Sequence, residues 1–71
     1  MNHEKIARKI TAEALELIAK EPEHKFAIAQ LAIRSISPVI QDLLNSEHFT
    51  PNGTALELQK ELLDKIEKAC K

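Results

Sequence analysis

The sequence predicts an all-α protein, a small antiparallel bundle of three helices that pairs with a second copy. Of its 71 residues, 44% are hydrophobic, 30% are charged and one is Gly, which is typical of a globular helical protein and not of a disordered chain. Apolar residues recur at helical spacing in three segments, and the middle segment is unusually apolar. A chain of this length is expected to form one domain, residues 1–71.

The first helix is expected to span about residues 3–20, with Asn2 as its N-cap. Its apolar residues fall in one sector about 120° wide when the chain is drawn as a helix: Ile6, Ile10, Ala14, Leu17 and Ile18. Charged residues occupy the opposite side. Glu16 and Lys20 have the i,i+4 spacing of a favourable ion pair.

The second helix is expected over residues 23–45. Pro22 suits its first turn, because the N–H that proline lacks has no partner there. The connection from the first helix is so short that the two helices should be antiparallel neighbours.

Pro38 leaves two alternatives for the second helix. Proline removes a hydrogen bond and clashes with the carbonyl four residues earlier, so the helix either splits near Ser35 or continues with a kink. A single helical phase from residue 23 to residue 45 places the main polar residues in one narrow stripe: Glu23, Gln30, Arg34, Ser37 and Gln41. This shared phase favours the kinked, continuous helix.

A loop and a third helix complete the chain. Residues 50–53, Thr-Pro-Asn-Gly, have the composition of a β-turn, and Phe49 is expected to pack back onto the bundle. Thr54 and Glu57 have the spacing of a capping box. The residues that follow form one apolar ridge: Leu58, Leu62, Ile66 and Ala69.

The apolar sector of the second helix is the reason to expect a dimer. It covers about 200° in a single helical phase, whereas a helix that packs in a three-helix monomer needs a little over 100°. The surplus should form an exposed patch, and such patches usually mark interfaces, most often in two-fold homodimers. The expected dimer-interface residues are Ile28, Ile33, Ile40 and Leu44. The alternative is that the other two helices and Phe49 cover the whole sector.

The sequence offers little material for catalysis or metal binding. Cys70 falls on the apolar edge of the last helix, where a cysteine behaves as a small hydrophobic residue. The three histidines, His3, His24 and His48, have no His or Cys at ligand spacing, and one Gly cannot form a glycine-rich phosphate loop. We therefore expect no enzymatic activity, no cofactor and no metal.

Nucleic-acid and membrane binding are not expected either. Residues 31–43 resemble a helix-turn-helix, with Ile36 and Ser37 in place to open a recognition helix. The turn Gly is missing, however, and the would-be recognition helix offers Gln41 and Asp42 where phosphate contacts need Lys or Arg. The net charge is −1, and the amphipathic helices lack the basic face of a membrane-surface helix. With no signal-peptide pattern at the N-terminus, we expect a cytoplasmic protein.

The leading functional prediction is a non-enzymatic module for protein–protein interaction or regulation, acting as a homodimer. A protein partner is expected, although its identity is not readable from the residues. The candidate partner-binding positions form the polar stripe: Glu23, Gln30, Arg34 and Gln41. Two alternatives remain, a small DNA-binding regulator with a degenerate helix-turn-helix and a neutralising protein of the immunity or antitoxin type.

Overall fold

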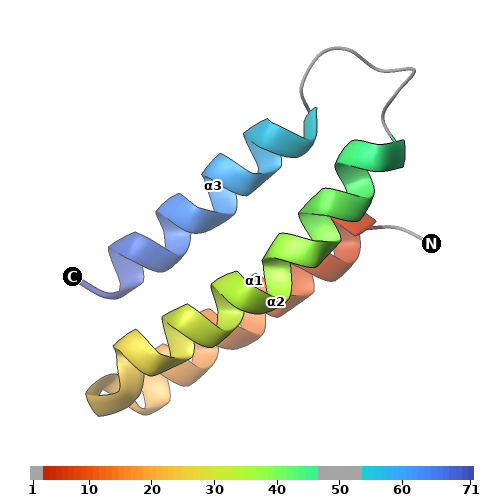
Figure 1. Cartoon of the computed structure of the whole chain (residues 1–71). Coiled ribbons are helices and arrows are strands. Elements are labelled where there is room, and N and C mark those ends of the chain that lie inside the picture. The colour runs from red at the N-terminus through yellow and green to blue at the C-terminus, as the bar shows by residue number, and fades with distance from the viewer. Residues whose placement is uncertain (1–2, 47–53) are drawn as a thin grey trace.

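The computed structural model describes residues 3–46 and 54–71, which form a bundle of three helices (Figure 1). Helix α1 spans His3–Lys20, α2 spans Lys25–Ser46 and α3 spans Thr54–Ala69, and a 3₁₀ turn, η1, covers Pro22–His24 before α2. The predicted all-α, three-helix architecture is confirmed. The expected Asn2 cap, the β-turn, the position of Phe49 and the side chain of Thr54 in its capping box lie outside the described residues.

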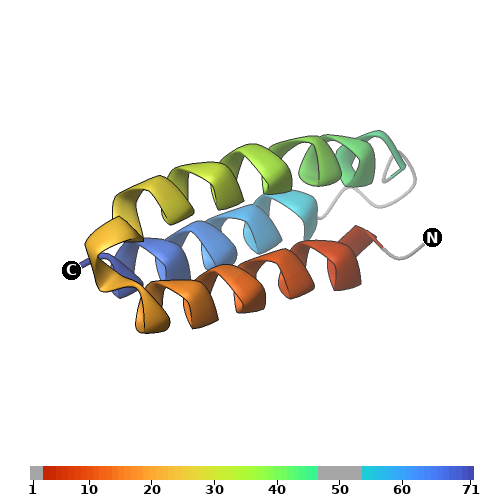
Figure 2. The same ribbon diagram turned by 90° about the horizontal axis from the view of Figure 1, so that it is seen from below.

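The link between α1 and α2 is a tight backbone turn. The backbone N–H of Glu21 donates to the carbonyl of Leu17 at 2.8 Å, and that of His24 donates to the carbonyl of Glu21 at 2.9 Å. Pro22 is the first residue of η1, where its missing N–H leaves no hydrogen bond unmade. Because the link is so short, α1 and α2 run antiparallel and side by side (Figure 2).

Helix α2 continues through Pro38 as one element. The alternative of two helices that separate at this proline is therefore wrong, and a kink in the continuous helix stays a prediction. One residue before Pro38, the hydroxyl of Ser37 donates to the carbonyl of Ile33, one turn earlier in the helix, at 2.9 Å. A hydroxyl that bonds back to the preceding turn is a common way for a mid-helix serine to satisfy its side chain.

The core contains many small side chains. Five of the eleven buried hydrophobic residues in the described part of the chain are alanines: Ala7, Ala14, Ile18, Ala29, Ala32, Ile36, Ile40, Ala55, Leu58, Leu62 and Ile66. Thr11 is buried as well, and its hydroxyl donates to the carbonyl of Ala7 at 2.9 Å. Alanine brings backbones close together, but it buries little apolar surface.

Helix α3 lies over the seam between α1 and α2, on one face of the pair, and contacts both helices (Figures 1 and 2). Its predicted ridge is confirmed at Leu58, Leu62 and Ile66, which are 1–4% exposed. Ala69 is half-buried at the end of the ridge. The opposite face of the α1–α2 pair has no helix packed on it among the described residues.

No helix in residues 3–46 and 54–71 is both long enough and apolar enough to span a bilayer.

Candidate interaction surfaces

Large apolar side chains lie on the outside of this protein, while alanines fill much of its inside. Exposed fractions reach 70% for Phe26 and 64% for Leu31, and three more large residues are well exposed: Leu17, Ile33 and Leu56. Full burial of such a side chain would stabilise the protein by about 1.5–3 kcal/mol relative to its exposed state. Their positions therefore mark the surfaces where a partner would gain most by covering them.

The first such surface is a groove between α1 and α2 of about 180 Å³. We call it the α1–α2 groove, and its lining residues are Ile10, Glu13, Ala14, Leu17, Ile28, Leu31, Ala32 and Ser35. Leu17 is nine positions after Arg8, which places the two on opposite sides of α1 at 3.6 residues per turn. Since Arg8 contacts α3, the groove lies on the face turned away from α3, the face that Figure 2 presents.

The second surface follows the outer edge of α2 and α3. We call it the α2–α3 edge, and it comprises Phe26, Ile33, Leu56 and Leu63. Phe26 and Ile33 are two turns apart on α2, and Leu56 and Leu63 have the same spacing on α3. Cys70 follows Leu63 by seven positions, just beyond the end of α3. The two rows meet where the thiol of Cys70 donates to the carbonyl of Lys25 at 3.6 Å. The ammonium of Lys25 lies 5.2 Å from the centre of the Phe26 ring.

Helix α2 differs from its neighbours in charge as well. It carries three charged residues in 22, Lys25, Arg34 and Asp42, whereas α1 carries seven in 18 and α3 carries seven in 16. Depletion of charged residues is the compositional mark of the centre of a protein interface. The exposed side of α2 is therefore the part of the described surface best suited to burial against another protein.

The predicted partner-binding stripe lies on this exposed side. All four of its residues are exposed, with Glu23 in η1 and the other three on α2: Glu23, Gln30, Arg34 and Gln41. Arg34 follows Leu31 by three positions, so the two side chains are neighbours on the helix surface. The polar stripe thus borders the α1–α2 groove.

The predicted dimer-interface residues are distributed over different parts of the structure. Ile28 is half-buried and lines the α1–α2 groove, and Ile33 is 39% exposed on the α2–α3 edge. Leu44 is half-buried against the core, and Ile40 lies within the core at 2% exposure. Ile40 therefore contributes to the packing of the single chain and offers no surface to a partner. Leu17 and Leu31, which the sequence did not single out for an interface, are more exposed than any of the four.

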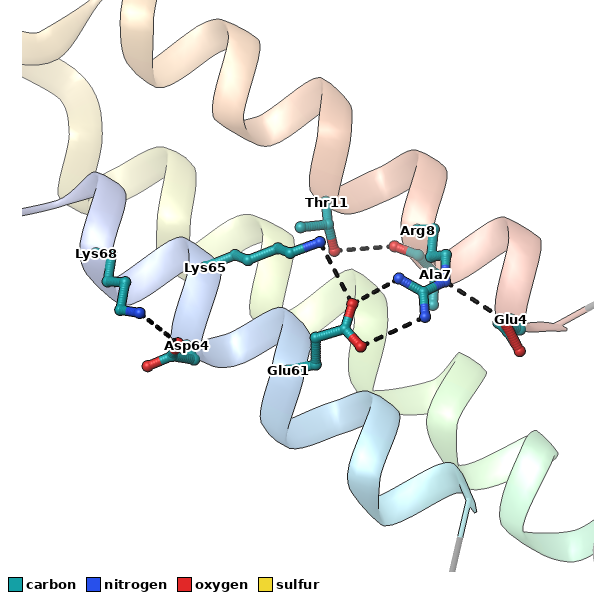
Figure 3. A network of polar contacts seen from close by, with 8 residues as sticks. All are labelled: Glu4, Ala7, Arg8, Thr11, Glu61, Asp64, Lys65 and Lys68. Atoms are coloured by element: carbon teal, nitrogen blue, oxygen red, sulfur yellow. Dashed lines mark hydrogen bonds and ion pairs between the residues drawn. The ribbon is translucent and has the colours of Figure 1, made fainter.

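A polar network joins α1 to α3 on the far side from the groove (Figure 3). Arg8 donates to Glu61 at 2.6 Å and to Glu4 at 3.4 Å, and Lys65 lies 3.3 Å from Glu61. The hydrogen bond from Arg8, followed by that from Lys65, lowers the pKa of the Glu61 carboxyl below its ordinary value. The bond to Glu61 likewise raises the pKa of Arg8. All of these groups are solvent-exposed, and their contacts link α1 to α3 at the surface of the bundle.

Among residues 3–46 and 54–71, one group of side chains has the spacing of metal ligands. Glu21, Glu23 and His24, at the turn between α1 and α2, bring their ligand atoms within 4.8 Å of one another. All three are exposed, and exposed acidic groups commonly gather at turns without binding an ion. These three side chains therefore match a set of metal ligands in their spacing alone. All three are exposed, so nothing in their burial indicates that they bind an ion.

A larger hollow of about 440 Å³ lies over the charged face of α3. Its lining residues all come from that one helix and are exposed: Glu57, Lys60, Glu61 and Asp64. Ligand sites are mostly apolar concavities with a few convergent polar groups. The smaller α1–α2 groove fits that description better than this charged, one-sided hollow.

The chain matches no protein-family model, no curated protein and no solved structure.

Proposed function

We propose that this protein is a non-enzymatic interaction module that acts as a homodimer and presents its second helix to a protein partner. The observation that carries the proposal is the inverted distribution of apolar residues. Five alanines are buried, whereas Leu17, Phe26, Leu31, Ile33 and Leu56 are 39–70% exposed. These large side chains are thus available for burial against another chain, either a second copy or the further protein partner.

The size of the chain adds to this argument. A chain of 71 residues buries a smaller fraction of its surface than a larger protein does, so its folded state has a thin margin of stability. Association supplies apolar burial that a core rich in alanine lacks. The net charge of −1 opposes the approach of a second copy only weakly.

The DNA-binding alternative is not favoured by the structure of residues 31–43. A helix-turn-helix needs a turn between two helices, and here the residues belong to the uninterrupted helix α2. The exposed face of that helix carries one basic residue after Lys25, namely Arg34. A neutralising role of the immunity or antitoxin type is a special case of partner binding, and no observation singles it out.

Sedimentation equilibrium over a micromolar concentration range tests the proposal. A homodimer has twice the chain mass of 8.0 kDa and dissociates on dilution. A mass of 8.0 kDa at every concentration would exclude the dimer. An affinity pull-down with the dimeric protein then asks for the further partner, with a variant of the polar stripe, Gln30→Ala with Gln41→Ala, as its matched control.

A further inference from the structure

We infer that the second copy covers the α1–α2 groove, with its two-fold axis parallel to the helices, so that α1 of each chain packs on α2 of the other and Glu13 faces Arg34 of the partner subunit. This inference rests on the proposed homodimer and specifies its interface. The α1 and α2 helices of both chains would form a four-helix bundle with antiparallel neighbours at the centre of the dimer, and one α3 would lie on each outer side.

The shape of the groove suits a helix pair. α1 has 18 residues, about 27 Å at a rise of 1.5 Å per residue, and it runs antiparallel beside α2 on the face without α3. Two such faces can stack with the crossing angles usual in four-helix bundles. Leu31, 64% exposed beside the groove, would then enter the apolar space between Ile10 and Leu17 of the other chain.

Two opposite charges beside the groove lack a partner within the described chain. Glu13 lines the groove and Arg34 borders it, and neither belongs to any ion pair among residues 3–46 and 54–71. Of the other charged residues of α1, Glu4, Arg8, Glu16 and Lys20 form ion pairs, whereas Lys9 forms none among the described residues. An acid on one helix and a base on the other form a self-complementary pair of charges, as a two-fold interface requires.

The heights of these two residues along the bundle determine the symmetry axis. The Nε2 atom of His3 on α1 lies 3.9 Å from Oδ2 of Asp42 on α2, so these two residues are at the same level along the bundle. The two helices run antiparallel from there. Ten residues further along each helix, Glu13 is therefore level with Ala32 and about 3 Å along the axis from Arg34. A two-fold axis parallel to the helices preserves these heights and places Glu13 within reach of Arg34 of the partner subunit.

The competing two-fold arrangement is disfavoured by charge. A two-fold axis perpendicular to the helices would pack α1 of one chain on α1 of the other. If this axis passed through the centre of the groove, a residue above the centre in one chain would lie opposite a residue equally far below it in the other. The α1 residues of the groove run from Ile10 to Leu17, so its centre lies at Glu13 and Ala14. That axis would bring Glu13 against Glu13 of the partner subunit, a like-charge contact in a partly desolvated interface.

Charge reversal tests the pairing directly. In Glu13→Arg, each chain would present only positive charge at both contacts, and in Arg34→Glu only negative charge. Each single variant should dimerise more weakly than the wild type. Its dissociation constant should rise about tenfold or more, because the two-fold axis makes the unfavourable contact occur twice in each dimer. An equimolar mixture of the two variants should recover association, since E13R and R34E chains complement each other at both contacts. The double variant should recover it as well.

Sedimentation equilibrium at low ionic strength measures all five samples, and far-UV circular dichroism verifies that their helical content is equal. Leu31→Gln should also weaken the dimer, whereas Leu56→Gln, on the α2–α3 edge, should leave it intact. A monomeric wild type would overturn the proposed homodimer and this interface together. A dimeric wild type whose single charge variants associate normally, or whose mixture shows no recovery, would overturn the interface and leave the homodimer standing.

Discussion

Arg8 on α1 and Glu61 on α3 face each other across 53 positions of sequence and form a two-pronged contact (Figure 3). The Nη1 atom of Arg8 donates to Oε2 of Glu61 at 2.6 Å, and Nη2 lies 3.5 Å from Oε1. Planar, paired contacts of this kind specify orientation better than a single ammonium does. The contact holds α3 in register on α1, on the side of the bundle away from the groove.

Glu61→Gln should lower the melting temperature slightly at neutral pH, and the difference should vanish in acid. Arg8 and Lys65 depress the pKa of Glu61 in the folded protein. The pairing therefore favours the folded state above the ordinary carboxyl pKa of 4.5 and is lost as pH falls through the lower, folded value. Thermal melts at pH 7 and at a series of pH values descending from 4.5 follow the loss of this difference.

The matched control is Asp64→Asn. Asp64 pairs with Lys68 at 3.1 Å within α3, so it connects no two helices, and its loss should affect the melting temperature less. A wild-type advantage over E61Q that stays constant from neutral to acid pH would show that the carboxyl charge is not what stabilises the contact.

Replacing Ala7 by Leu should destabilise the protein by about 1–3 kcal/mol. Ala7 is 0% exposed, and its small side chain lets the helices approach closely, so a larger one would force them apart. Ala12, five positions along the same helix, is exposed, and Ala12→Leu should change the free energy of unfolding by at most about 0.5 kcal/mol. Urea denaturation at one fixed protein concentration compares the two variants, and equal effects would refute close packing at Ala7.

Leu62→Ala should remove a large share of the protein's stability. Leu62 is 1% exposed among the core residues, and removing a buried leucine side chain costs about 2–5 kcal/mol. A chain of 71 residues has a total stability of only about 4–11 kcal/mol. Leu56→Ala, at 55% exposure on the same helix, should cost much less, and chemical denaturation distinguishes the two. A similar loss at Leu56 would mean that this residue is buried in solution.

The fold was predictable because its signals are local. Pro22, the helical spacing of Leu58, Leu62 and Ile66, and the short link between the first two helices depend only on neighbouring residues. Continuity through Pro38 followed from the shared phase of the polar stripe.

The identity of the core and of the exposed surface was less predictable, because both depend on where α3 docks. Hydropathy placed Leu17 in the core sector, whereas the structure leaves it 44% exposed and buries Ala7 and Thr11 instead. Small residues carry little hydropathic signal, although close helix packing selects them. The spacing Ala7, Thr11, Ala14, Ile18 was visible in the sequence and could have indicated a seam of small residues.

Pro38→Ala should stabilise the protein, because Pro38 lies inside helix α2. A proline inside a helix removes the hydrogen bond to the carbonyl four residues earlier, here that of Arg34, and costs about 3 kcal/mol or more. Part of this gain is offset, since an alanine gives the unfolded chain more freedom, by about 0.4–1 kcal/mol. A net increase of about 2 kcal/mol should raise the melting temperature, with Ser37→Ala as the neighbouring control. A lower melting temperature for P38A would mean that the packing around α2 depends on the shape that proline imposes.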